Sequence, residues 1–148
     1  MSKDRFTLPA AVFLFLIQGD KILLMRRSGT GWHDGDYDLA AGHIDGNESL
    51  TTTVCREAHE EMGITIDPVN VKFVNLMHAY FAEDGKEYFD IYFEVEKWQG
   101  EPKIMEPGKC DDMQWFSLDR LPENLTPSTQ MGLAAYQARS SYTEFGFE

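Results

Sequence analysis

The chain has 148 residues, 43% of them hydrophobic, and a formal net charge of -12. Its length suits one folded domain spanning residues 1–148, with enough apolar sequence for a core of two or three layers. The acidic surface disfavours a nucleic-acid polymer or an anionic membrane as a partner, because recognition of either needs clustered Lys and Arg.

The first predicted elements are two strands joined by a turn. Residues 10–17 are a continuous run of aliphatic and aromatic residues, which predicts a strand buried on both faces. The run is too short to span a bilayer. Cys55 and Cys110 form no CxxC pair, so a soluble cytoplasmic protein is expected. After turn residues at 18–21, the segment 22–25 resumes the strand pattern.

The pattern then changes from loop to strand to helix. Residues 28–36 are rich in glycine and predict a loop, and residues 37–41 predict a short strand. Between residues 49 and 62 an apolar residue recurs at every fourth position, which predicts a helix. Asn47 is suited to cap the start of this helix, and Gly63 is suited to end it.

The rest of the chain predicts three more strands and one more helix. The strands are expected over residues 69–81, 88–98 and 112–118, the first two joined by the turn at 83–86. A final helix is expected to begin at residue 127 or 128 and to run through residue 137. This mixture predicts an α/β fold in which a mixed sheet lies between helices.

The first predicted helix carries three glutamates that need an explanation. Glu57, Glu60 and Glu61 fall within about 100° of one another on an ideal helix, partly over its apolar stripe. Three like charges there repel one another unless a divalent cation supplies the opposite charge. Carboxylates favour Mg²⁺, and no thiolate or paired imidazole selects zinc. The alternative is a solvated acidic face, in which Arg56 is only an i,i+4 partner of Glu60.

The segment from Gly42 to Ile64 resembles the Nudix box, G-x5-E-x7-R-E-U-x-E-E-x-G-U, in which U is an apolar residue. Every fixed position matches: Gly42, Glu48, Arg56, Glu57, Glu60, Glu61 and Gly63. Ala58 and Ile64 occupy the two U positions. The predicted order of strands and helices is also similar to that of the Nudix α/β/α sandwich. The resemblance implies this fold and a hydrolase that cuts a phosphoanhydride bond.

The resemblance implies roles for the residues of the box. Glu57, Glu60 and Glu61 would bind Mg²⁺, for which Mn²⁺ is a substitute, and Gly42 would add its backbone carbonyl. Glu48 and Arg56 would form an ion pair that orients the glutamates. The general base stays open between Glu57, Glu60 and Glu106, with Glu57 the first choice.

Further candidates lie outside the box. Glu106 follows the segment W-x-G-E-P at residues 98–102, after which some Nudix hydrolases place another metal-binding or base glutamate; an ordinary loop glutamate is the alternative. Arg26 and Arg27 end a predicted strand, and one of them is expected to contact phosphate, because adjacent strand side chains point to opposite faces. His43 is a further candidate for a phosphate contact.

The substrate is predicted only by class. The compact chain resembles Nudix hydrolases that convert a nucleoside triphosphate, often a modified one, to a nucleoside monophosphate and pyrophosphate, with Asn124 as the base-reading candidate. Tyr80 would suit a dinucleoside polyphosphate hydrolase, although a strand tyrosine more often packs in the core. The absence of proline between residues 69 and 98 disfavours an ADP-ribose hydrolase. A nucleotide-binding module without catalysis is the remaining alternative, and the complete box disfavours it.

Overall fold

The apolar run near the N-terminus forms the central strand, β1 (Ala10–Gln18). In the computed structural model, which describes residues 4–147, the residues from 11 to 17 are all buried. β1 pairs antiparallel with β2 (Lys21–Arg27) and β4 (Ala40–His43), and parallel with β6 (Lys86–Val95). The prediction of a strand buried on both faces is confirmed.

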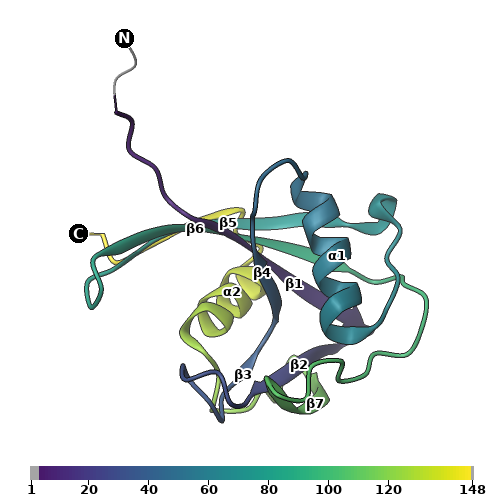
Figure 1. Cartoon of the computed structure of the whole chain (residues 1–148). Coiled ribbons are helices and arrows are strands. Elements are labelled where there is room, and N and C mark those ends of the chain that lie inside the picture. Colours follow the sequence, from purple (N-terminus) through teal and green to yellow (C-terminus); the bar gives the residue numbers. More distant parts are fainter. Residues whose placement is uncertain (1–3, 148) are drawn as a thin grey trace.

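The other strands extend the sheet on either side of β1 (Figure 1). The main strand order is β3-β2-β1-β6-β5-β8, with β4 added to β1 and β7 added to β2. The new strands are β3 (Tyr37–Asp38), β5 (Lys72–Phe81), β7 (Cys110–Ser117) and β8 (Tyr142–Phe145). The sheet is mixed because β1 pairs with β6, and β5 with β8, in parallel.

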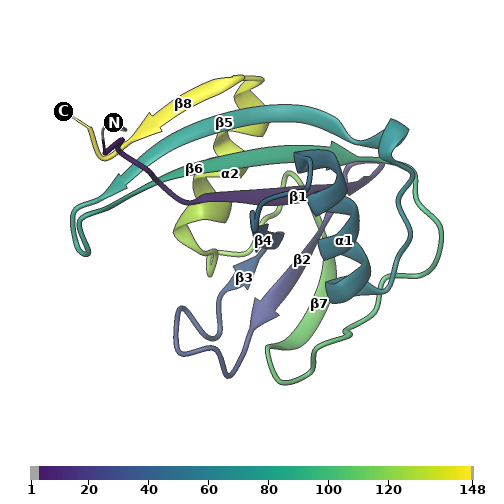
Figure 2. The same cartoon turned by 45° about the horizontal axis from the view of Figure 1, so that its top comes forward.

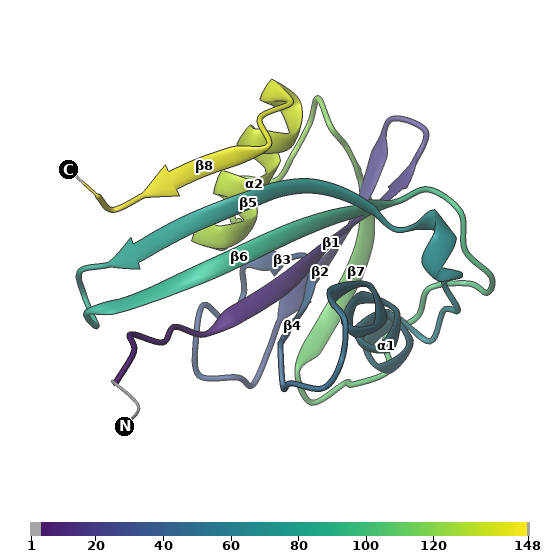
Figure 3. The ribbon, with the colours of Figure 1, turned by 90° about the horizontal axis from the view of Figure 1, so that it is seen from above.

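Two helices cover opposite faces of the sheet, α1 (Leu50–Met62) and α2 (Pro127–Ala138) (Figures 2 and 3). Alternate residues of β1 serve two separate apolar clusters, since Leu14 packs with the α1 side and Phe15 with the α2 side. This is the expected α/β/α arrangement. Neither helix in the described part of the chain is long and apolar enough to cross a membrane.

The start of α1 differs from the prediction. Ser49 is the N-cap, and its side chain accepts a hydrogen bond of 3.1 Å from the backbone N–H of Thr52. The prediction of Asn47 as the cap is wrong, because a cap must lie directly before the first turn to reach its free N–H groups. Gly63 ends the helix as predicted, with a φ of 70° and its N–H bonded to the carbonyl of His59.

Several strand boundaries also differ from the prediction. A short 3-10 helix, η1 (Pro68–Asn70), precedes β5, so that strand begins at Lys72. β6 ends at Val95, three residues before the predicted end. The predicted strand at 37–41 is divided between β3 and β4. The edge strand β8 was not predicted.

Candidate active site

β4 and α1 meet closely at Gly42 and Glu57. A Cβ atom added to Gly42 would overlap the carboxyl group of Glu57, so only glycine permits this approach. One turn further along the helix, Glu61 Oε2 accepts a hydrogen bond of 3.2 Å from the backbone N–H of Ala41. The helical period therefore brings both carboxylates against the same short strand.

Arg56 binds the carboxylates of the box together. Its guanidinium lies 3.0 Å from Glu48 Oε1, 2.9 Å from Glu57 Oε1 and 3.3 Å from Glu60 Oε2. The expected ion pair with Glu48 is present, and Thr53 also donates to Glu48 over 2.9 Å. The hydrogen bond from Arg56 lowers the pKa of Glu48. Arg56 thus limits the directions in which Glu57 and Glu60 can point.

Burial raises the pKa of two of these glutamates. It raises the pKa of Glu57 in spite of the opposing hydrogen bond and charge of Arg56. It raises the pKa of Glu61 strongly, with the charges of Glu57 and Glu106 adding to the effect. A nearby cation stabilises the charged form of carboxylates that are desolvated and close to one another.

The donor set fits a hard divalent cation such as Mg²⁺, because it consists of carboxylate and carbonyl oxygens. Within residues 4–147, no three or more His, Cys, Asp and Glu side chains already converge as a ready coordination shell. Arg56 donates to Glu57 Oε1, and the Ala41 N–H donates to Glu61 Oε2, so each carboxylate keeps a second oxygen outside these bonds.

A hollow of about 470 Å³ lies beside Glu61. β2, the loop after it, α1 and the segment before β7 all contribute to its wall. Glu106 faces the hollow, and Lys109 Nζ lies 3.6 Å from its carboxylate. The lining residues are Met25, Arg26, Arg27, Gly29, Thr30, Asp38, Leu39, Glu61, Glu106, Lys109 and Cys110.

Both arginines at the end of β2 line this hollow, which corrects the expectation that only one would face the site. The register between β2 and β7 shifts between Arg26 and Arg27, so strict alternation of side chains fails there. Arg26 Nε lies 2.7 Å from Asp111 Oδ1, and Arg27 Nη1 lies 3.2 Å from Asp38 Oδ2.

Asp38 lines the hollow but was not among the predicted site residues. Its side chain is buried and accepts hydrogen bonds from Arg27, from the hydroxyls of Thr126 and Thr129, and from the Leu39 N–H. It therefore ties the arginine to the start of α2. An aspartate inside a short, otherwise apolar strand was the available signal.

Of the candidates other than the fixed residues of the box, three also lie outside the lining of the hollow. His43 is exposed at the end of β4, next to Gly42. Asn124 Nδ2 donates over 2.8 Å to the carbonyl of Gly35, so its side chain anchors the β2–β3 loop. Tyr80 lies near the tip of the β5–β6 hairpin, at the end remote from α1 (Figure 2), with its ring 6.1 Å from that of Phe147.

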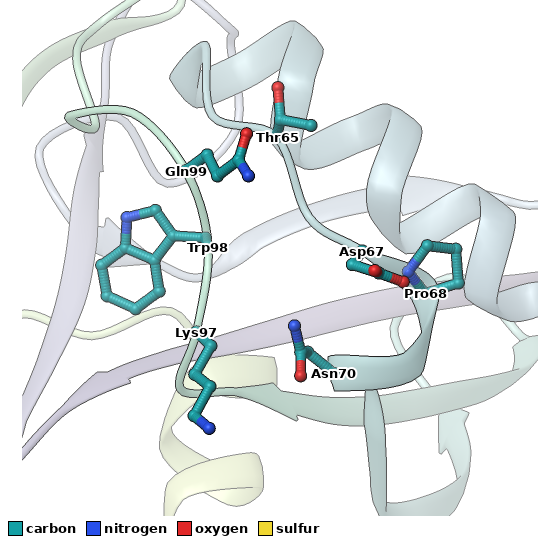
Figure 4. A pocket seen from close by; sticks show the side chains of 7 residues that line it. All are labelled: Thr65, Asp67, Pro68, Asn70, Lys97, Trp98 and Gln99. Atoms are coloured by element: carbon teal, nitrogen blue, oxygen red, sulfur yellow. The ribbon is translucent and has the colours of Figure 1, made fainter.

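A second hollow, of about 630 Å³, lies between η1 and the segment after β6 (Figure 4). It is lined by Thr65, Asp67, Pro68, Asn70, Lys97, Trp98 and Gln99. None of the glutamates of the box and neither strand-end arginine reaches it. The chemistry of the lining therefore makes the smaller hollow the candidate active site.

Known proteins with similar sequences and folds identify the family of this chain. The sequence model of the NUDIX domain matches residues 7–135. The oxidized purine nucleoside triphosphate hydrolase of Danio rerio is 28% identical over 121 residues, which cover 79% of this chain and 71% of that protein. The crystal structure of a MutT NUDIX hydrolase from Burkholderia pseudomallei has a TM-score of 0.80 at 26% identity, covering 88% of this chain and 98% of that one.

Other relatives are longer. The NAD-capped RNA hydrolase NudC of Stutzerimonas stutzeri (strain A1501) is 29% identical over 118 residues, and the match covers 78% of this chain but 38% of that protein. The chain thus spans about two fifths of the length of that relative. The box, the fold and the family match together show that the chain belongs to the Nudix family, whose members are hydrolases acting on pyrophosphate bonds.

Proposed function

We propose that this Nudix hydrolase is Mg²⁺-dependent and converts a nucleoside triphosphate, including modified ones, to a nucleoside monophosphate and pyrophosphate. The observation that supports this proposal is the meeting of Glu61 and Glu106 with two arginines, Arg26 and Arg27, around one hollow. Carboxylates to hold a cation and guanidinium groups to hold phosphate oxygens are the two parts that phosphoanhydride cleavage needs. The likeness to a purine nucleoside triphosphate hydrolase supports the same substrate class.

The cation would be held by the carboxylates of Glu57, Glu60, Glu61 and Glu106, together with the backbone carbonyl of Gly42. Bound Mg²⁺, or Mn²⁺ in its place, would neutralise phosphate oxygens and lower the pKa of a bound water. Arg56 and Glu48 are positioning residues in this scheme, since they touch the glutamates and no part of the hollow.

The arginines and one glutamate have the direct roles. Arg27 contacts phosphate from a fixed position, because Asp38 holds its guanidinium on the other side. Arg26 also contacts phosphate, and its guanidinium is held by Asp111. His43 adds a phosphate contact from the exposed end of β4. Glu57 accepts the proton of the attacking water, because its carboxylate lies against Gly42 at the place where the cation and its water would be held.

The test is a screen with Mg²⁺ and with Mn²⁺ against deoxynucleoside triphosphates, oxidised deoxynucleoside triphosphates, dinucleoside polyphosphates, ADP-ribose, NAD and nucleotide sugars. We expect the triphosphates to be cleaved fastest, with monophosphate and pyrophosphate as products. Release of orthophosphate, or preference for a substrate without a triphosphate, would contradict the proposed reaction. Binding of nucleotides without turnover of any compound would indicate the non-catalytic alternative.

A further inference from the structure

We propose that Trp32 forms the stacking surface for the nucleobase of the substrate, an inference that rests on the function proposed above. Trp32 lies in the β2–β3 loop and 49% of it is exposed to solvent. Tryptophan is enriched at binding interfaces, because its ring is apolar and its indole N–H is polar. The neighbours of Trp32 indicate which contact this is.

The loop that carries Trp32 is held in one conformation. The carboxylate of Asp34 accepts hydrogen bonds from the N–H groups of Thr30 and Gly31, over 3.0 and 2.9 Å, and another from the Thr30 hydroxyl. Arg27 Nε donates over 2.7 Å to the carbonyl of Trp32 itself. The indole is therefore presented by an ordered turn, which reduces the entropy lost when a ligand binds.

One face of the indole is already covered by a cation. The guanidinium carbon of Arg27 lies 4.9 Å from the centre of the Trp32 ring. The rings of Trp32 and His33 meet in a T-shaped contact, with 4.3 Å between their centres. With Arg27 on one face, the exposed half of the residue is available to a second flat ring. Stacking on an aromatic side chain, with a cation–π contribution from arginine, binds a base without reading its edges.

Arg27 also connects Trp32 to the active site. It lines the hollow that contains Glu61 and Glu106, so the indole lies one side chain away from that hollow. A triphosphate that contacts Arg27 can place its nucleoside beside the β2–β3 loop, whose residues Gly29 and Thr30 line the hollow and whose Trp32 packs on Arg27. The glutamates and arginines serve the phosphates of the substrate, and Trp32 contacts its nucleobase, which inorganic phosphates lack.

The test compares two ligands that differ in the base. Dissociation constants are measured in Mg²⁺ for α,β-methylene ATP and for a methylene-bridged triphosphate without a nucleoside. For Trp32→Ala we expect the constant for the nucleotide to rise about tenfold, equal to about 1.4 kcal/mol, and that for the triphosphate alone to stay the same. Trp32→Phe should retain most of the nucleotide affinity. Phe6→Ala, which removes an aromatic residue that is 73% exposed on the N-terminal segment, is the matched control.

Each result decides the role of Trp32. Equal weakening of both ligands in Trp32→Ala would mean that the indole only supports Arg27, and unchanged binding of both would mean that it has no part in recognition. Either outcome overturns the inference while leaving the proposed function intact. If the unaltered protein binds the bridged triphosphate as tightly as it binds the nucleotide, the base has no binding surface and the inference also fails. If the unaltered protein binds neither ligand, the proposed function itself fails.

Discussion

At the scale of single residues, the glutamates of α1 are not equivalent. Glu57 and Glu61 are partly desolvated and touch β4, whereas Glu60 is on the exposed side of the helix. The same helix therefore offers a carboxylate with a raised pKa, Glu57, beside a half-exposed one, Glu60, that is paired with Arg56. Such a difference in surroundings is how neighbouring acids acquire different chemical roles.

Replacing Glu57 tests its role as the base. Glu57→Gln should lower kcat by about 10²–10⁴-fold, because the amide cannot accept the proton. Steady-state rates and circular dichroism are to be compared with Glu83→Gln, which changes an exposed glutamate between β5 and β6. A larger loss of kcat in Glu106→Gln than in Glu57→Gln would transfer the role of base to Glu106.

A second residue, Asp90 on β6, makes stability depend on pH. It is 4% exposed, and burial, followed by the charge of Asp38, raises its pKa from 3.8 to about 7. As the pH rises, the Asp90 carboxyl ionises at a lower pH in the unfolded chain than in the folded one. Asp90 therefore has no effect on stability below pH 4 and destabilises the fold increasingly between pH 4 and pH 7. The whole difference between the pKa of Asp90 in the unfolded and folded chain corresponds to at most about 4 kcal/mol of stability.

The variant Asp90→Asn keeps the shape and removes the charge. It should be more stable than the unaltered protein at pH 8 and close to it at pH 4. Urea unfolding at both values measures the difference, with Asp84→Asn in the exposed turn as the control. A variant that loses stability equally at both values would mean that Asp90 acts through a hydrogen bond instead.

At the scale of elements, two loops form the rim of the hollow and depend on each other. The β2–β3 loop and residues 106–109 are joined by a hydrogen bond of 2.9 Å from the Ser28 N–H to the carbonyl of Lys109. At Gly29, where φ is +68°, an added Cβ would lie 2.6 Å from the carbonyl oxygen of Gly108. The first loop begins directly after Arg27 and the second contains Glu106, so the separation of the loops sets the geometry of the site.

Gly29→Ala should therefore separate the loops. Besides the cost of a left-handed alanine, about 1–2 kcal/mol, it forces the backbone at Gly108 outward, and we expect kcat/KM to fall about tenfold or more. Gly31→Ala is the matched control, because Gly31 has a φ of +83° but open space around its Cβ position. Equal kinetic losses in the two variants would show that loop strain, and not the contact between loops, is responsible.

At the scale of the whole molecule, net charge and metal binding are linked. A chain with a formal charge of -12 that also concentrates carboxylates in one hollow should gain stability from a bound cation. Apolar packing on both sides of β1 sets the shape of the fold, so we expect metal binding to change stability and the site without changing the architecture.

Mg²⁺ or Mn²⁺ at about 100 times its dissociation constant should stabilise the protein by about 2.7 kcal/mol. The increase in Tm with metal concentration measures this, and it should be much smaller in Glu61→Gln. Ca²⁺ and Na⁺ at matched ionic strength separate specific binding from general screening of the charge. An increase in Tm that is the same for all the salts would contradict a specific site.

The sequence by itself determined the class of fold, the family and the carboxylates of the box. It could do so because these depend on local periods: the spacing of glutamates on a helix and the continuous apolar run of β1 follow from 3.6 residues per turn and from strand burial. The end of α1 at Gly63 is equally local, since a left-handed residue is needed there.

The tertiary structure alone decided which residues meet the glutamates. Asp38 bonds to Thr126 and Thr129, 88 and 91 residues further along the chain, and the shift between β2 and β7 brings both arginines to one hollow. Likewise, the unpredicted β8 exists only because β5 offers it a free edge. Such contacts depend on how packed elements are placed against each other, and no local pattern carries that information.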